Sequence, residues 1–129
     1  MGYGAFMNVV NNRSEPIRLF VTDVTCMYDN GESGSNLSLF DNTTVAATSE
    51  LPGGHGEYIE VKASGSCLFE SSTFTLKVED AATATIIGHV SCRERYNNWD
   101  WSSDNADVVD LYINNSGDQA VIRVTVEAF

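Results

Sequence analysis

Basic side chains are scarce in this chain of 129 residues: seven Lys and Arg stand against eighteen Asp and Glu, which gives a formal charge of -11. Generic nucleic-acid binding rests on Lys and Arg contacts to phosphate, so the composition excludes nucleic acid as a partner. Anionic membranes should repel the protein for the same reason. Neutral or zwitterionic lipid surfaces and glycans remain as candidate partners.

Long apolar runs are also absent. No stretch approaches the roughly 18 to 20 apolar residues that a transmembrane helix needs. The segment Met1–Phe6 lacks the basic start, apolar middle and small-residue cleavage site of a secretory signal. Localisation therefore stays open, and we expect cytoplasmic synthesis, with any export to the extracellular space or a membrane surface following an unconventional route or earlier processing.

Cysteine is sparse, and its three copies lie far apart at Cys26, Cys67 and Cys92. Without a CxxC pair they indicate neither a metal-binding knuckle nor a fully paired disulfide framework. Free Cys is among the most buried residue types. We therefore expect buried free thiols in strands.

Catalytic and metal-binding motifs are missing as well. His55 and His89 are the only histidines, and neither belongs to a GxSxG or HExxH pattern. We expect no enzymatic activity and no cofactor. Asp100 to Asp110 contains four aspartates without the DxDxDG order of a calcium loop. We interpret them as solvated turn residues and predict no metal site, with Ca²⁺ held by loop oxygens as the alternative. Asp29, Glu32 and Asp41 edge a second such loop.

Apolar residues instead recur at every second position. Phe74, Leu76 and Val78 share one face of a predicted strand over 73–79, and the run 84–92 would pair with it as an antiparallel hairpin. No stretch shows a helical period, and turn residues recur about every 8 to 15 positions. The sequence predicts an all-β, single-domain antiparallel β-sandwich of about seven to nine strands over residues 1–129.

The same alternation predicts the core. Its members are Phe74, Leu76, Val78, Ile87, Val90, Leu111, Ile113, Ile122, Val124 and Val126. In the strand that begins at Ile17, the phase shifts near Asp23, which indicates a bulge or bend. Leu37, Leu39 and Val45 mark a further short strand region after the Gly- and Ser-rich segment 29–36.

One stretch departs from any period. Residues 93–101 are charged and aromatic, and we predict a recognition loop there. Tyr96, Trp99 and Trp101, with Tyr28 elsewhere in the chain, offer flat rings that suit stacking on sugars or insertion at a lipid interface. The alternative is that a Trp closes the end of the sandwich, and we expect one Trp buried and the other exposed.

Short motifs also occur in a characteristic order. They are Pro52-Gly53-Gly54, the segment Val61–Cys67 with its Gly and Cys, Thr73-Phe74-Thr75-Leu76, Ile87-Gly88-His89-Val90, Cys92 and Asn98-Trp99-Asp100. This order resembles the aegerolysins, small acidic β-sandwich proteins found mainly in fungi and bacteria. The N-terminal half is similar in outline, with Ala5-Phe6-Met7 in the first strand and Asn11-Asn12 at the following turn. The family's Trp-Gly-Lys is replaced by Met27-Tyr28-Asp29, and its Trp-Asp-Cys-Pro-Trp-Gly by residues 91–96.

The resemblance implies a non-enzymatic protein that binds membrane lipid and recruits a larger pore-forming partner. Phe6, Tyr28 and Tyr96 stand near the family's lipid-contacting aromatics. Our leading hypothesis is therefore a lipid-binding protein, the recognition component of a two-component cytolysin, with Phe6, Tyr28, Tyr96, Trp99 and Trp101 as ligand-binding residues. The alternatives are a small lectin that uses Tyr96, Trp99 and Trp101, and a structural or inhibitory protein without a small ligand.

Overall fold

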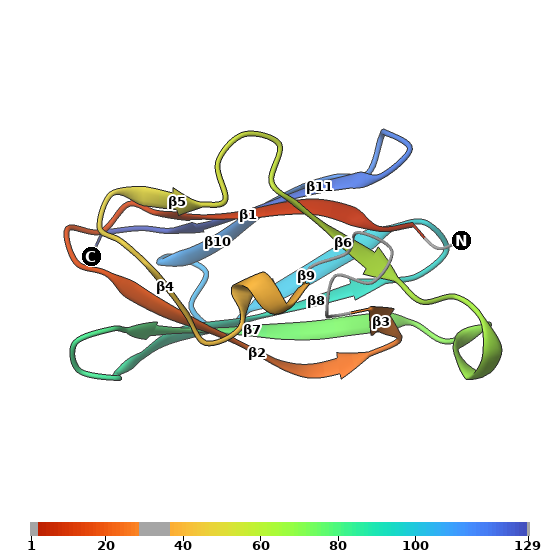
Figure 1. The fold of residues 1–129 in the computed structure, drawn as a ribbon, viewed down its shortest axis with the longest axis horizontal. Coiled ribbons are helices and arrows are strands. Elements are labelled where there is room, and N and C mark those ends of the chain that lie inside the picture. Colours follow the sequence, from red (N-terminus) through yellow and green to blue (C-terminus); the bar gives the residue numbers. More distant parts are fainter. Residues whose placement is uncertain (1–2, 29–36, 129) are drawn as a thin grey trace.

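A computed structural model of the chain describes residues 3–28 and 37–128 (Figure 1). These residues form eleven strands and two short 3-10 helices. The strands are β1 Ala5–Asn11, β2 Ile17–Thr25, β3 Met27–Tyr28, β4 Thr43–Val45, β5 Ser49–Leu51, β6 Glu57–Val61, β7 Ser72–Asp80, β8 Ile86–Glu94, β9 Trp99–Ser103, β10 Val109–Asn114 and β11 Ala120–Val126. The 3-10 helices are η2 Leu37–Phe40 and η3 Gly65–Cys67. No helix in the described part of the chain has the length and apolar character needed to cross a membrane.

The strands form two sheets that lie one above the other in Figure 1. One sheet has six strands in the order β10-β11-β1-β6-β3, with β5 also paired to β1, and the other has five in the order β4-β2-β7-β8-β9. The predicted all-β sandwich is confirmed, and so is the β7–β8 hairpin. The strand count exceeds the prediction because β3, β4 and β5 span only two or three residues each, too few to show an alternation.

One strand pair differs from the predicted antiparallel arrangement. β1 and β11 run parallel, with Met7 opposite Ile122 and Val9 opposite Val124. Parallel neighbours need a long connection between them. Here nearly the whole chain is that connection, because the first and last described strands are the ones that pair.

The core between the sheets agrees with the predicted strand phases. Eight of the ten predicted residues are buried: Phe74, Leu76, Val78, Val90, Leu111, Ile122, Val124 and Val126. Ile87 and Ile113 are half-buried and pack against the same cluster. Burial of large apolar side chains is the main favourable contribution to such a fold, at roughly 25 cal/mol for each Å² removed from water.

The predicted irregularity in β2 is confirmed. Its register against β7 shifts between Thr22 and Thr25, and Asp23 has a positive φ of 54°. Cys26, with a φ of 55°, follows directly. This bend carries the chain from the five-stranded sheet to β3, which pairs with β6 in the other sheet. The bend therefore brings Cys26 and Tyr28 to the end of the sandwich where the candidate site lies.

The region of Leu37 and Leu39 differs from its prediction. It forms the 3-10 helix η2, and only Thr43–Val45 is a strand. Residues three apart lie on the same side of a 3-10 helix, so Leu37 and Phe40 both reach the core here. The preceding segment 29–36, with Asp29 and Glu32, lies outside the described residues.

Two neighbouring side chains in β11 test the strand phase. Ile122 is fully buried, whereas Val121 is 44% exposed. Ile122→Val should lower the free energy of unfolding by about 1 kcal/mol, since one buried methylene is lost. The matched exposed variant, Val121→Ala, should change it by less than about 0.5 kcal/mol. Urea denaturation measures both, and equal losses would contradict this placement of β11.

Candidate functional site

The predicted recognition loop over residues 93–101 is mostly strand. β8 continues to Glu94 and β9 begins at Trp99, with Arg93 opposite Asp100 and Glu94 opposite Trp99. Only residues 95–98 form the connecting turn. The alternation was hidden because Glu94, a charged residue, points inward and is buried, so the usual apolar-inside pattern fails at the end of β8.

Trp99 is a core residue, which corrects its prediction as a ligand-binding aromatic. It is 2% exposed, and its indole Nε1 donates a hydrogen bond to the main-chain oxygen of Tyr3 at 3.0 Å. Its ring meets Phe74 edge-on, with ring centroids 5.9 Å apart. Trp99 thus closes the end of the sandwich between the sheets. Trp101 is half-buried and packs against the core.

Tyr96 remains an exposed aromatic, with 86% of its surface accessible. It lies in the tight turn of residues 95–98, where Tyr96 and Asn97 both have positive φ angles. Arg95 and Asn98 exchange two main-chain hydrogen bonds across the turn, and the Asn97 N–H donates to Oε2 of Glu94 at 2.9 Å. The Arg95 guanidinium lies 5.0 Å from the centre of the Tyr96 ring. The turn is therefore a rigid support for one outward-pointing ring.

A disulfide joins Cys26 to Cys67, which corrects the expectation of three free thiols. The two residues are 41 positions apart, and with an odd number of cysteines no spacing in the sequence indicated this pair. Cys92 is free and buried, and desolvation, reinforced by the negative charge of Asp100, raises the pKa of its thiol to about 12. It is therefore an unreactive core residue.

The disulfide holds a loop with two exposed apolar side chains. Directly after Cys67, Leu68 is 58% exposed and Phe69 is 87% exposed. Strand periodicity in the sequence does not identify these two residues. A signal was present, because an apolar pair stands alone between the polar segments 64–66 and 70–73.

The loop that carries Leu68 and Phe69 and the turn of residues 95–98 both line one pocket of about 220 Å³. We call this pocket the tip pocket, and its opening with Leu68, Phe69 and Tyr96 the tip. The pocket is lined by Val61, Lys62, Ala63, Cys67, Leu68, Phe69, Glu70, Glu94, Arg95, Tyr96 and Asn97. Figure 1 shows this loop, which begins with η3, and the turn between β8 and β9 at the same end of the sandwich. Tyr28 does not line the pocket, but the ammonium of Lys62, a lining residue, lies 5.8 Å from the centre of the Tyr28 ring.

Charges of both signs line the tip pocket. Lys62 and Arg95 supply two cations, and Glu70 and Glu94 two carboxylates. Glu94 is only 6% exposed. Burial raises the pKa of its carboxyl, although the hydrogen bond from the Asn97 N–H opposes this effect. The tip pocket thus has a partly apolar opening and a polar interior with charges of both signs, and such a pocket suits an amphipathic ligand.

No family model and no curated protein matches this chain. The site must therefore be interpreted from its own geometry, together with the motif resemblance given above.

Phe6 lies apart from the tip pocket. Its side chain is 36% exposed on β1, and its ring centroid stands 5.2 Å from that of Tyr58 on β6. This pair belongs to the outer face of the six-stranded sheet. Of the predicted ligand-binding residues, Tyr96 thus lines the tip pocket and Tyr28 contacts Lys62 of its lining, whereas Phe6 and Trp101 do not line it.

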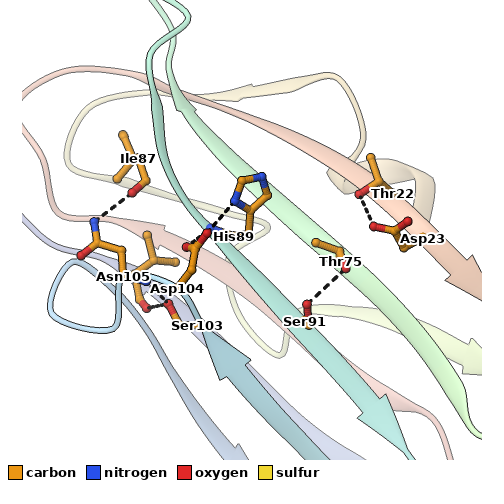
Figure 2. Close-up of polar contacts among 10 residues, drawn as sticks. Thr22, Asp23, Thr75, Ile87, His89, Ser91, Ser103, Asp104 and Asn105 are labelled. Atoms are coloured by element: carbon orange, nitrogen blue, oxygen red, sulfur yellow. Dashed lines mark hydrogen bonds and ion pairs between the residues drawn. The ribbon is translucent and has the colours of Figure 1, made fainter.

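A second hollow, of about 370 Å³, lies along β7, β8 and β9 on the five-stranded sheet. Its polar lining includes the hydroxyls of Thr75 and Ser91, which lie 3.3 Å apart (Figure 2). Arg93 and Asp100 form an ion pair of 3.3 Å beside them. Trp101 also lines this hollow. We call it the sheet groove.

His89 and Asp104 form a polar pair near the sheet groove (Figure 2). The main-chain N–H of His89 donates to Asp104 Oδ1 at 2.7 Å, and the ring Nδ1 lies 2.8 Å from Oδ2. These hydrogen bonds, the main-chain one first, lower the pKa of the Asp104 carboxyl. The resulting stabilisation of the fold is present at neutral pH and is lost as the pH falls through the pKa that the Asp104 carboxyl has in the folded protein.

The aspartates between Asp100 and Asp110 are therefore engaged in part with His89 and Arg93. Within residues 3–28 and 37–128, no group of three or more His, Cys, Asp or Glu side chains is arranged to hold a metal ion. Asp41, from the second acidic segment, instead accepts a hydrogen bond from the Val21 N–H at 3.0 Å.

Proposed function

We propose that this protein binds neutral or zwitterionic membrane surfaces through the tip. The observation that carries the proposal is the clustering of three large exposed side chains, Leu68, Phe69 and Tyr96, on two loops around one pocket. Exposed apolar groups cost free energy in water, and a group of them at one end of a molecule marks an interaction site. Tyr is enriched where a protein meets lipid headgroups.

The charge distribution favours an uncharged or zwitterionic surface. With a formal charge of -11, the protein as a whole is repelled by anionic lipid. The lining of the tip pocket, however, includes the cations Lys62 and Arg95 together with the carboxylate Glu70. Such a mixture can bind a headgroup that carries both a phosphate and an amine, without a net electrostatic attraction.

The motif resemblance supports the same proposal and extends it. An aegerolysin-like role would be non-enzymatic, with membrane binding followed by recruitment of a larger pore-forming protein. The Cys26–Cys67 disulfide at the tip agrees with function outside the reducing cytosol, because disulfides persist in oxidising environments.

Glycan binding is the second candidate function, and the sheet groove favours it. Its hydroxyls, the Arg93–Asp100 pair and Trp101 are groups that can bind sugar hydroxyls. The lectin hypothesis loses the stacking surface of Trp99, however, because that ring is buried. We therefore place glycan binding after membrane binding.

Vesicle flotation tests the proposal. We expect the protein to float with phosphatidylcholine vesicles, with or without a neutral sterol, and to bind less when phosphatidylserine replaces part of the lipid at low salt. A glycan array measured in parallel tests the second candidate. If the protein binds none of the neutral vesicle compositions, the membrane proposal is overturned. Glycan-array binding that is lost in Arg93→Ala and Asp100→Ala would then support a glycan site in the sheet groove.

A further inference from the structure

The tip pocket contains a buried carboxylate that the fold does not pair with a cation. Glu94 is the last residue of β8 and points between the sheets, where it is 6% exposed. Its strand partners at this position are Ser72 and Trp99, which offer no charge. None of the ion pairs among the described residues involves Glu94.

The charged groups around Glu94 come from three segments. Lys62 follows β6, Glu70 follows η3, and Arg95 begins the turn after β8, and all three line the same pocket. The hydrogen bond that the structure gives to the Glu94 carboxylate comes from the Asn97 N–H at 2.9 Å. That bond holds the turn that presents Tyr96. Glu94 therefore connects the interior of the pocket to a membrane-facing side chain.

We propose that Glu94 takes up a proton when the tip meets a neutral membrane, so that mild acidification strengthens membrane binding. This inference rests on the proposed function of the tip.

The physical reason is desolvation. In the free protein, burial already raises the pKa of the Glu94 carboxyl. When Leu68, Phe69 and Tyr96 enter the headgroup region, water leaves the pocket between them, and the charged form of Glu94 is penalised further. The pKa in the bound state is then higher than in the free state. By linkage, binding takes up protons at any pH between these two pKa values.

The size of the effect follows from the same linkage. One proton taken up on binding changes the affinity by up to about tenfold for each pH unit. Protonation also turns a charged hydrogen-bond acceptor for the Asn97 N–H into a weaker neutral one. His55 and His89 do not line the tip pocket, so a variant of Glu94 alone separates its contribution from theirs.

The experiment compares the parent with Glu94→Gln on phosphatidylcholine vesicles between pH 5 and pH 8. Gln has no charge to lose and keeps an oxygen that accepts from the Asn97 N–H. We expect the parent to bind more tightly as the pH falls, and Glu94→Gln to bind at every pH about as tightly as the parent does at the acidic end. Glu70→Gln is the matched control in the same pocket, and it should keep the pH dependence of the parent.

A second measurement uses the unmodified sequence. The ¹³C chemical shift of the Glu94 carboxyl is followed by NMR as the pH is varied, with and without dodecylphosphocholine micelles. The titration midpoint of this carboxyl should rise when the protein binds the micelles. An unchanged midpoint, or a pH dependence in Glu94→Gln equal to that of the parent, would overturn this inference while leaving membrane binding in place. Absence of parent binding to neutral vesicles at all pH values would overturn the proposed function instead.

Discussion

Replacing Cys26 and Cys67 together by serine should lower the free energy of unfolding by about 4 kcal/mol. A crosslink between residues 41 positions apart removes conformational entropy from the unfolded chain, and the loop-closure relation gives this magnitude. Urea denaturation of the parent with and without a reductant measures the same quantity without substitution. Cys92→Ala is the matched control, because it removes the third cysteine and leaves the disulfide intact.

The same variant should also weaken binding to neutral vesicles. The Cys26 carbonyl accepts hydrogen bonds from the Lys62 N–H and the Ser72 hydroxyl, each at 2.8 Å, so Cys26 is fixed between β6 and β7. Through the disulfide, this fixed point holds the loop that carries Leu68 and Phe69. A loop that must be ordered on binding reduces affinity. An unfolding free energy and vesicle affinity both equal to those of the parent would contradict a structural role for the disulfide.

Much of the fold could be predicted because sheet structure has a clear signature in sequence. Phe74, Leu76 and Val78 alternate with polar residues, and all three are buried. The phase shift near Asp23 marked a real bulge. Both predictions depend only on near neighbours in the chain, since the period of a strand is two residues.

The features that could not be predicted depend on distant parts of the chain. Parallel pairing of β1 with β11 joins the two ends of the sequence, and the Cys26–Cys67 disulfide joins residues 41 apart. No local pattern encodes either contact. The 3-10 helix at Leu37 was also missed, because two apolar residues at alternating positions in a short segment fit a strand equally well.

The exposure of the predicted aromatic residues could be foreseen in part. Tyr96 was correctly singled out as an exposed aromatic, whereas Trp99, three positions later, is in the core. Local sequence does not distinguish them, because the inward direction of Trp99 is set by its pairing with Glu94 across the β8–β9 hairpin. Leu68 and Phe69 were missed for the opposite reason, since apolar residues in a loop carry no periodic signal and only the fold shows that they are uncovered.

Phe69→Ser should weaken binding to neutral vesicles by about 30-fold if the tip enters the membrane. Phe69 is 87% exposed, so almost its entire side chain is available for transfer from water. Transfer of a Phe side chain contributes about 2 kcal/mol, and this free energy corresponds to the stated change in affinity. Because an exposed side chain adds little to folding, the unfolding free energy should change by less than about 0.5 kcal/mol.

The combined variant Phe69→Ser, Tyr96→Ser should weaken binding further, toward a thousandfold if the two rings, which lie on separate loops, contribute comparably at about 2 kcal/mol each. Tyr112→Ser is the matched control, because Tyr112 is an aromatic residue on β10 with 58% exposure that does not line the tip pocket. It should bind vesicles like the parent. Phe6→Ser separates two versions of the site: a loss comparable to that of Phe69→Ser would extend the membrane-binding surface to the outer face of the six-stranded sheet, as the aegerolysin resemblance implies. Equal losses in Tyr112→Ser and Phe69→Ser would instead show that membrane contact is not localised at the tip.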